Sequence, residues 1–142
     1  MKDSLKVQFS NSGLSGFYPW LCISNVGGGL DTFFEFINCD AGDLSQFFYY
    51  DSTLQQIKNY NTGLCMSDLG YTSYGSGFQS LPCDPTNPNQ QFEYNGKLKN
   101  VAKDYCIHGY YWSGGRLVIW YCVYYTAFSM IPGKLLFFYI DE

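Results

Sequence analysis

Apolar residues fall into short runs along this chain, and stretches rich in Gly, Asn, Asp and Ser separate these runs. Three runs contain a cysteine near their start, and three later runs end at a cysteine. The six strings are "LCIS" at 21–24, "FFEFINC" at 33–39, "LCMS" at 64–67, "FQSLPC" at 78–83, "YCIH" at 105–108 and "LVIWYC" at 117–122. A turn-rich stretch joins each earlier run to the later one, as a β-hairpin requires. The pattern therefore predicts three hairpins.

The cysteines recur with a fixed period. They are Cys22, Cys39, Cys65, Cys83, Cys106 and Cys122. Successive pairs begin about 40 residues apart, which predicts a three-fold repeat with one disulfide inside each repeat. The predicted bridges are Cys22–Cys39, Cys65–Cys83 and Cys106–Cys122. Each would stabilise the fold by roughly 3 kcal/mol. Stable disulfides indicate an oxidising compartment, so we expect a secreted protein whose signal segment precedes residue 1.

A Gln-x-Phe motif follows the second cysteine of the first two pairs. It comprises Gln46 and Phe48 in repeat 1, and Gln90 and Phe92 in repeat 2. We expect the aromatic ring to fill the core near the pseudo-three-fold axis. The glutamine amide offers both a donor and an acceptor to nearby backbone. The motif is therefore predicted to have a structural role.

Repeat 3 departs from this spacing, because Ser129 stands at the position of the motif glutamine. The string "LLFFYID" at 135–141 resembles "SQFFYYD" at 45–51 instead. This likeness predicts the fourth strand of repeat 3 at 135–140, after an extended loop over 123–134.

The strands together predict the fold. With "LKVQFS" at 5–10 as the first strand, three repeats of four strands give a β-trefoil. We expect one all-β domain over 1–142, with repeats at about 1–52, 53–95 and 96–142.

Composition narrows the possible functions. The charged fraction is 14%, the net charge is −4 and there are only 8 Lys and Arg residues, so a nucleic-acid partner is not expected. No apolar run approaches the roughly 18 residues of a membrane span. A single His and the absence of a C-x-x-C pair argue against zinc, and no cofactor is implied. With neither a nucleophile elbow nor a phosphate loop, we do not expect an enzyme.

At this point the sequence resembles the ricin B-type lectin family, whose repeats carry a Gln-x-Trp signature. The likeness covers most of the chain and is carried by Gly63–Cys65, Gln79, Pro82–Cys83, Asn89–Phe92 and Asn95–Gly96. It implies a shallow sugar pocket in each competent repeat. The pocket would combine an acid two residues after the first cysteine, a glutamine and an aromatic ring before the second, and an asparagine before the motif glutamine. Such groups suit a sugar, which offers hydroxyls on its edge and an apolar C–H face.

Repeat 2 matches this pocket in part. It keeps Gln79 and Asn89, and Asp68 lies one place after the acidic position. Its ring position is aliphatic, so the candidates for a stacking ring lie in the preceding loop, at Tyr71 and Tyr74. Hydrogen bonding in turns and at strand ends is the alternative role for the polar residues.

The other repeats match less well. Repeat 3 has Trp120 at the ring position and His108 at the acidic position. Strand alternation would place Trp120 on the surface, whereas its apolar neighbours favour burial, and His108 has an ordinary surface role as its alternative. Repeat 1 has no full set: Ser24, Ile37 and Ser45 stand at the family's positions, and Asn25, Asp31 and Glu35 lie nearby in the sequence.

Two functions remain open. The first is a secreted carbohydrate-binding lectin or module that recognises glycans or glycoproteins weakly and through several sites. It would stand alone, form a homo-oligomer or direct a neighbouring toxin or enzyme domain. The second is a β-trefoil with decayed sugar sites that acts as a protein-interaction, toxin-subunit or inhibitor module. Incomplete acid and ring positions favour the second function, and the retained amides favour the first.

Overall fold

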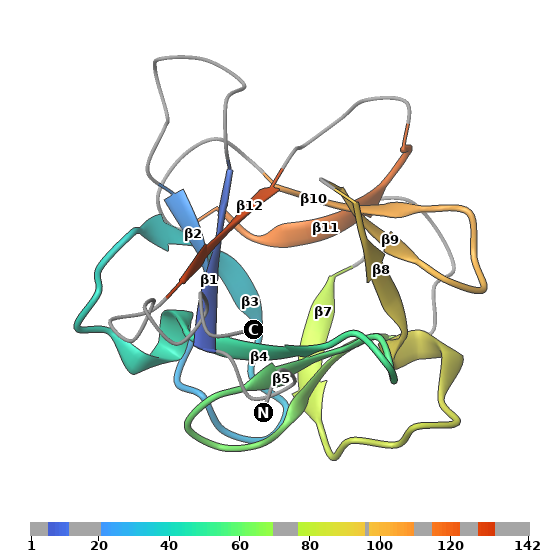
Figure 1. Cartoon of the computed structure of the whole chain (residues 1–142), viewed down its shortest axis with the longest axis horizontal. Coiled ribbons are helices and arrows are strands. Elements are labelled where there is room, and N and C mark those ends of the chain that lie inside the picture. Colours follow the sequence, from blue (N-terminus) through green and yellow to red (C-terminus); the bar gives the residue numbers. More distant parts are fainter. Residues whose placement is uncertain are drawn as a thin grey trace.

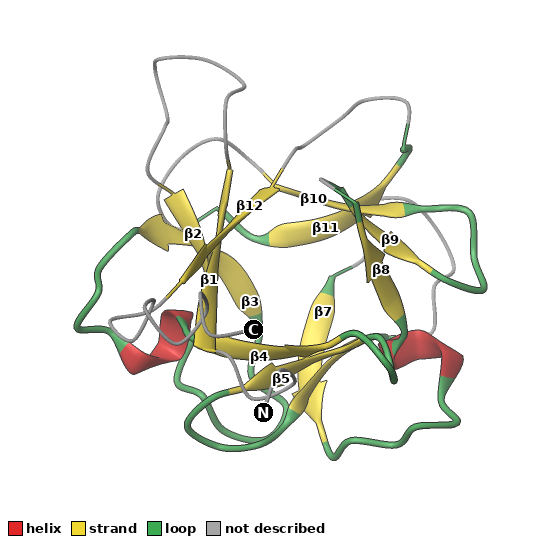
Figure 2. Ribbon diagram, viewed as in Figure 1, coloured by secondary structure: helices red, strands yellow, loops and turns green. Residues whose placement is uncertain are grey.

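The computed structural model describes residues 6–11, 21–69, 77–95, 97–109, 115–122 and 128–132 (Figures 1 and 2). These residues form β-strands and two short 3-10 helices, and none of them belongs to a helix long and apolar enough to cross a membrane. The strands are β1 (Lys6–Asn11), β2 (Leu21–Asn25), β3 (Phe34–Asn38), β4 (Phe48–Asp51), β5 (Gln56–Asn59), β6 (Cys65–Asp68), β7 (Phe78–Leu81), β8 (Phe92–Tyr94), β9 (Leu98–Asn100), β10 (Cys106–Gly109), β11 (Leu117–Trp120) and β12 (Phe128–Pro132). The 3-10 helices are η2 (Leu44–Gln46) and η3 (Pro88–Gln90).

Three hairpins, β2–β3, β6–β7 and β10–β11, form where the sequence predicts them. Side chains alternate between a core face and an outer face along each strand. In β3, Phe34 and Phe36 are buried in the core, whereas Glu35 and Ile37 lie half-buried on the outer face. β7 alternates in the same way, whereas the outer positions of β11 are the buried Val118 and the exposed Trp120.

The short helices η2 and η3 begin where the sequence supplies a cap. The Asp43 side chain accepts a hydrogen bond from the Ser45 N–H at 3.0 Å, and the Asn87 side chain accepts one from the Asn89 N–H at 2.9 Å. Pro88 also suits the first position of η3, since its missing N–H would have no helical partner there. Each helix turns the chain between the end of a hairpin and the next strand.

Strand β12 corrects the prediction for repeat 3. It pairs antiparallel with β1 from Val7↔Pro132 to Asn11↔Phe128. The predicted extended loop over 123–134 is therefore wrong, because part of it is a strand, and the predicted strand at 135–140 lies outside the described residues. β12 includes Ser129, which stands at the spacing of the motif glutamine, whereas likeness in residue type says nothing about which segment pairs with β1.

The strands and disulfides together make a β-trefoil. β1 pairs with β2, β4 and β12, β4 continues to β5, and the Phe92 N–H donates to the Gln55 carbonyl oxygen at 2.7 Å where β8 approaches β5. The three disulfides link Cys22 to Cys39, Cys65 to Cys83 and Cys106 to Cys122. The predicted fold of three four-stranded repeats, each with one internal disulfide, is confirmed.

Aromatic side chains from all three repeats fill the core. The motif residues Phe48 and Phe92 are fully buried. The ring of Phe48 lies 6.3 Å from that of Phe9, and the ring of Phe92 lies 6.0 Å from that of Phe78, measured between centroids. Rings at these distances pack in tilted or edge-to-face contact, which stabilises the core beyond the area that they bury.

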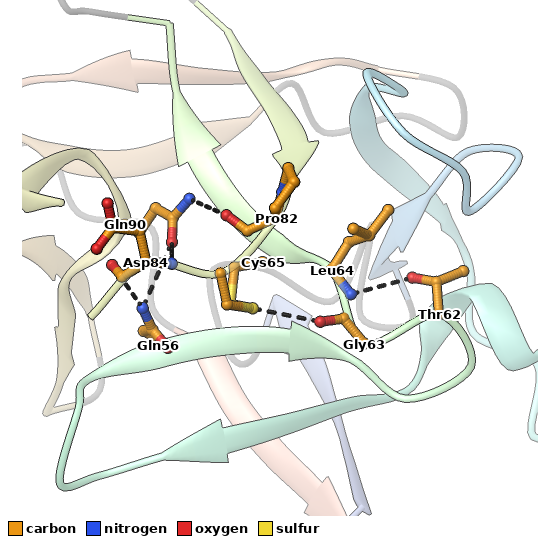
Figure 3. Close-up of a disulfide and its surroundings, with 9 residues drawn as sticks. Gln56, Thr62, Gly63, Leu64, Cys65, Pro82, Asp84 and Gln90 are labelled. Atoms are coloured by element: carbon orange, nitrogen blue, oxygen red, sulfur yellow. Dashed lines mark hydrogen bonds between the residues drawn. A yellow bond between two sulfur atoms is a disulfide. The ribbon is translucent and has the colours of Figure 1, made fainter. Parts of the chain in front are cut away.

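The motif glutamines are buried and bond to backbone. Gln90 Oε1 accepts a hydrogen bond from the Asp84 N–H at 2.9 Å, and Gln90 Nε2 donates to the Pro82 carbonyl oxygen at 3.0 Å (Figure 3). Gln46 makes the equivalent bonds, to the Asp40 N–H at 2.9 Å and the Asn38 carbonyl oxygen at 2.8 Å. Each amide thus fastens a 3-10 helix to the segment that follows its hairpin.

We expect Gln90→Ala to lower the free energy of unfolding by about 2 to 3 kcal/mol, because it leaves a buried donor and a buried acceptor unpaired. Urea unfolding at a constant m-value would measure this loss. Gln91→Ala is the matched control, since Gln91 is half-buried and its amide bonds to one described residue, donating to the Pro85 carbonyl oxygen at 2.9 Å. Equal losses in the two variants would contradict a special structural role for Gln90.

Candidate functional site

The positions that correspond to the family's acidic residue differ among the repeats. Ser24 and Ser67 occupy this position in repeats 1 and 2 and are buried beneath η2 and η3. The Ser24 and Ser45 hydroxyl oxygens are 2.8 Å apart, and the Ser67 hydroxyl donates to the Asp68 carbonyl oxygen at 3.1 Å. These hydroxyls therefore serve internal contacts.

Asp68 points into the protein. Its exposed fraction is 2%, and its carboxylate accepts hydrogen bonds from Lys103 Nζ, at 3.1 Å to Oδ2, and from the Tyr105 hydroxyl. Asp68 therefore lies at the end of a strand with its carboxylate directed inward, and not in an exposed loop. Along β6, Asp68 shares the inward face with Met66, and a shift of one residue from the acidic position moves the side chain to the other face of the sheet.

Lys103 joins two of the predicted site residues to each other. Besides its ion pair with Asp68, its ammonium donates to Asn89 Oδ1 at 2.5 Å. The Lys103 N–H in turn donates to the Asn100 side chain at 2.8 Å, which holds the loop after β9 in place. We call Asp68, Lys103, Tyr105 and Asn89 the inter-repeat clasp, because it links repeat 2 to repeat 3.

Repeat 1 has a neutral counterpart of the clasp. Asn25 lies at the position of Asp68 and is also buried. Its Oδ1 accepts a hydrogen bond from Asn59 Nδ2 of repeat 2 at 3.1 Å, and its Nδ2 donates to Thr32 Oγ1 at 2.9 Å. A polar residue at the end of the second strand thus holds neighbouring repeats together in both places.

Gln79 lies half-buried on the outer face of β7. It is opposite Ser67 within the hairpin, and it also forms an isolated bridge with Phe33 at the start of β3. Its amide makes no hydrogen bond to another residue that the structure describes. Gln79 is therefore separated from Asp68, which faces the opposite side of the sheet. The predicted stacking rings, Tyr71 and Tyr74, lie outside the described residues.

Repeat 3 brings its two candidates together. In the β10–β11 register, Cys106 is opposite Trp120 and His108 is opposite Val118, so His108 and Trp120 are diagonal neighbours on the outer face. Such neighbours are about 7 to 8 Å apart. Trp120 is 37% exposed, and its ring packs edge-on against Tyr121 with 5.9 Å between centroids.

Among the described residues, no 3-10 helix packs on β10 as η2 and η3 pack on β2 and β6, and on this face Val118 is buried whereas Trp120 is exposed. Chemically, this face combines the apolar surface of an indole ring with an imidazole that can donate and accept hydrogen bonds. No cluster of three metal-ligating side chains occurs among the described residues.

Comparisons with known proteins agree on the fold. The sequence matches the family model described as the ricin-type beta-trefoil lectin domain over residues 18–127. The earthworm R-type lectin C-half in complex with GalNAc is 13% identical, with a TM-score of 0.72, 90% of this chain covered and 98% of that chain. The Vibrio vulnificus hemolysin/cytolysin β-trefoil lectin with N-acetyl-D-lactosamine bound is also 13% identical at a TM-score of 0.72, with coverages of 92% and 96%.

A third structure, GalNAc-T7 with UDP, GalNAc and Mn²⁺, is 18% identical at a TM-score of 0.62, and the match covers 88% of this chain but 22% of that chain. A search of curated protein sequences finds no significant match. Identities this low show the fold alone, whereas the family model spans most of the chain and all three disulfide pairs. The chain therefore belongs to the ricin-type β-trefoil lectin domain family.

Proposed function

We propose that the protein binds carbohydrate on the outer face of β10–β11. The observation that carries this proposal is the half-open Trp120 ring, placed diagonally to His108. A sugar would stack its C–H face on the indole and direct a hydroxyl to the imidazole. Family membership supports a carbohydrate ligand, and GalNAc and N-acetyl-D-lactosamine, which are bound in two similar structures, are the first probes to use.

Repeat 3 is a better candidate than repeat 2. In repeat 2, the Lys103 ammonium already donates hydrogen bonds to the Asp68 carboxylate and to the side-chain oxygen of Asn89. One shallow site of this kind would bind a sugar near millimolar, or about 4 kcal/mol. Useful avidity would then come from several copies of the chain or from a neighbouring binding domain.

The proposal includes an oxidising compartment. All six cysteines are paired, and disulfides persist outside the reducing cytosol. We also propose that the lectin can direct a neighbouring toxin or enzyme domain. The transferase structure, of which this fold matches about a fifth, is an example of a similar fold within a much longer chain.

Trp120→Ala is expected to weaken sugar binding at least ten-fold, because the stacking surface is lost. The melting temperature should change little, since the ring is partly exposed. Chemical-shift titration with GalNAc and N-acetyl-D-lactosamine would measure the affinities, and thermal unfolding would measure stability.

Tyr60→Ala is the matched control. Tyr60 has the same exposed fraction, 37%, and its ring packs on that of Tyr49 with 5.3 Å between centroids. It should bind both sugars as the wild type does. If Trp120→Ala also binds them normally, the site lies elsewhere. If the wild type binds no sugar on a broad glycan array, the protein-interaction or inhibitor function is favoured.

A further inference from the structure

The third strands of the three repeats are β3, β7 and β11. Their N-terminal ends, with the residues just before them, come together near the middle of the view in Figure 1. Two isolated bridges join them: Phe33 with Gln79, and Glu35 with Arg116. The Phe36 N–H also donates to the Gly115 carbonyl oxygen at 2.8 Å. This junction therefore brings together residues that are far apart in the sequence and come from all three repeats.

The side chains at the junction share the outer face. Glu35 and Gln79 each alternate with buried core residues, as Phe33 and Arg116 do at the strand starts. The Arg116 guanidinium carbon lies 4.1 Å from the centroid of the Phe33 ring. Gly77 adjoins this contact, and a Cβ there would already touch Arg116 Cδ at 3.8 Å, so the glycine leaves room for the arginine side chain to reach the ring.

Three polar groups at the junction have no hydrogen-bond or ion-pair partner among the described residues. The Glu35 carboxylate, the Gln79 amide and the Arg116 guanidinium make no hydrogen bond or ion pair with another described residue. The ring of Phe33 limits the freedom of the guanidinium, and its N–H donors remain available.

An acceptor and several donors are thus adjacent on a half-open surface. Each hydroxyl of a sugar both donates and accepts hydrogen bonds, so this combination suits neighbouring hydroxyls. An anion would meet the Glu35 carboxylate and a net charge of −4, so a neutral ligand is favoured.

Strand β11 connects this junction to Trp120. Arg116, Val118 and Trp120 point to the same face, because side chains alternate along the strand. Trp120 lies four positions after Arg116, which is about 13 Å along a strand. We propose that Glu35, Gln79 and Arg116 form a second saccharide subsite, the axial subsite, which takes a further neutral sugar residue of an oligosaccharide held at Trp120. This inference rests on the proposed function.

Affinity as a function of oligosaccharide length tests the axial subsite. The probes are N-acetyllactosamine and the tetrasaccharide that contains two such units, titrated by calorimetry or chemical shift. We expect the wild type to bind the tetrasaccharide at least ten-fold more tightly. Arg116→Ala and Gln79→Ala should each remove most of this gain and leave the disaccharide affinity unchanged, whereas Trp120→Ala should weaken binding of both probes.

Lys58→Ala is the control for loss of a positive charge, because Lys58 lies half-buried on β5, a strand outside the junction. It should retain the full gain. If Arg116→Ala and Gln79→Ala bind both probes normally while Trp120→Ala does not, the axial subsite is refuted and the proposed function stands. If the wild type binds neither probe, both proposals fail for this ligand class. If 6'-sialyllactose shows the larger dependence on Arg116, the assignment to a neutral sugar is overturned.

Discussion

Replacing Asp68 by alanine is expected to lower the free energy of unfolding by about 3 kcal/mol. A broken buried ion pair costs 3 to 5 kcal/mol, and the lower end applies because the Lys103 side chain is 26% exposed. The loss has two parts: the Lys103 ammonium loses its counter-ion, and the buried Tyr105 hydroxyl loses its acceptor. Burial, and then the nearby Asp68 carboxylate, raise the pKa of Tyr105, so this hydroxyl stays protonated and continues to need an acceptor.

Urea unfolding measures the effect, with two comparison variants. Asp68→Asn retains an acceptor for Tyr105 and should lose less stability than Asp68→Ala. Asp104→Ala removes an exposed carboxylate from the adjacent loop and should stay within about 0.5 kcal/mol of the wild type. If Asp68→Ala keeps its stability and loses glycan binding, Asp68 is a sugar-binding residue, and the structural role of the inter-repeat clasp is contradicted.

Removing the Cys65–Cys83 disulfide by changing both residues to alanine should also cost about 3 kcal/mol. The bridge links residues 18 positions apart, and the chain-entropy model assigns this value to a loop of that size. Thermal unfolding should show a decrease of roughly 10 °C in Tm. The bridge anchors the segment on which Gln90 bonds to Pro82 and Asp84 (Figure 3).

The other two disulfides provide an internal comparison. They span 17 and 16 positions, so the chain-entropy model assigns nearly the same cost to each corresponding double variant. Losses below about 1 kcal/mol for all three pairs would show that the hairpins are held by packing alone.

The fold could be predicted because most of its signals are local and repeated. Each hairpin carries its own cysteine pair, and the three copies confirm one another, so both the β-trefoil and the disulfide pairing follow from spacing. Strand β12 could not be placed by residue likeness, since its position depends on pairing with β1 at the other end of the chain.

In the candidate site too, residues within one hairpin could be predicted from the sequence, whereas contacts between repeats could not. Trp120 and His108 belong to one hairpin and could be named as candidates from their spacing to the cysteines, whereas their shared face follows from the register of β10 and β11. Asp68 faces inward because it is offset by a single residue. Nothing local connects it to Lys103, which lies 35 positions away in the sequence. The junction of Glu35, Gln79 and Arg116 depends on three separate repeats and required the structure.

The pairing of β1 with β12 has a consequence for the order of folding. Each disulfide-bonded hairpin involves neighbouring residues, whereas this pair joins Val7 to Pro132. Contacts between distant residues form slowly, because a long loop must close before they contribute stability. During synthesis, β1 would leave the ribosome early, and it could pair with β12 only after the hairpins between them had been made. Pairing of β1 with β12 is therefore expected to be a late step in folding, and the edge of β1 that binds β12 would stay unpaired until then.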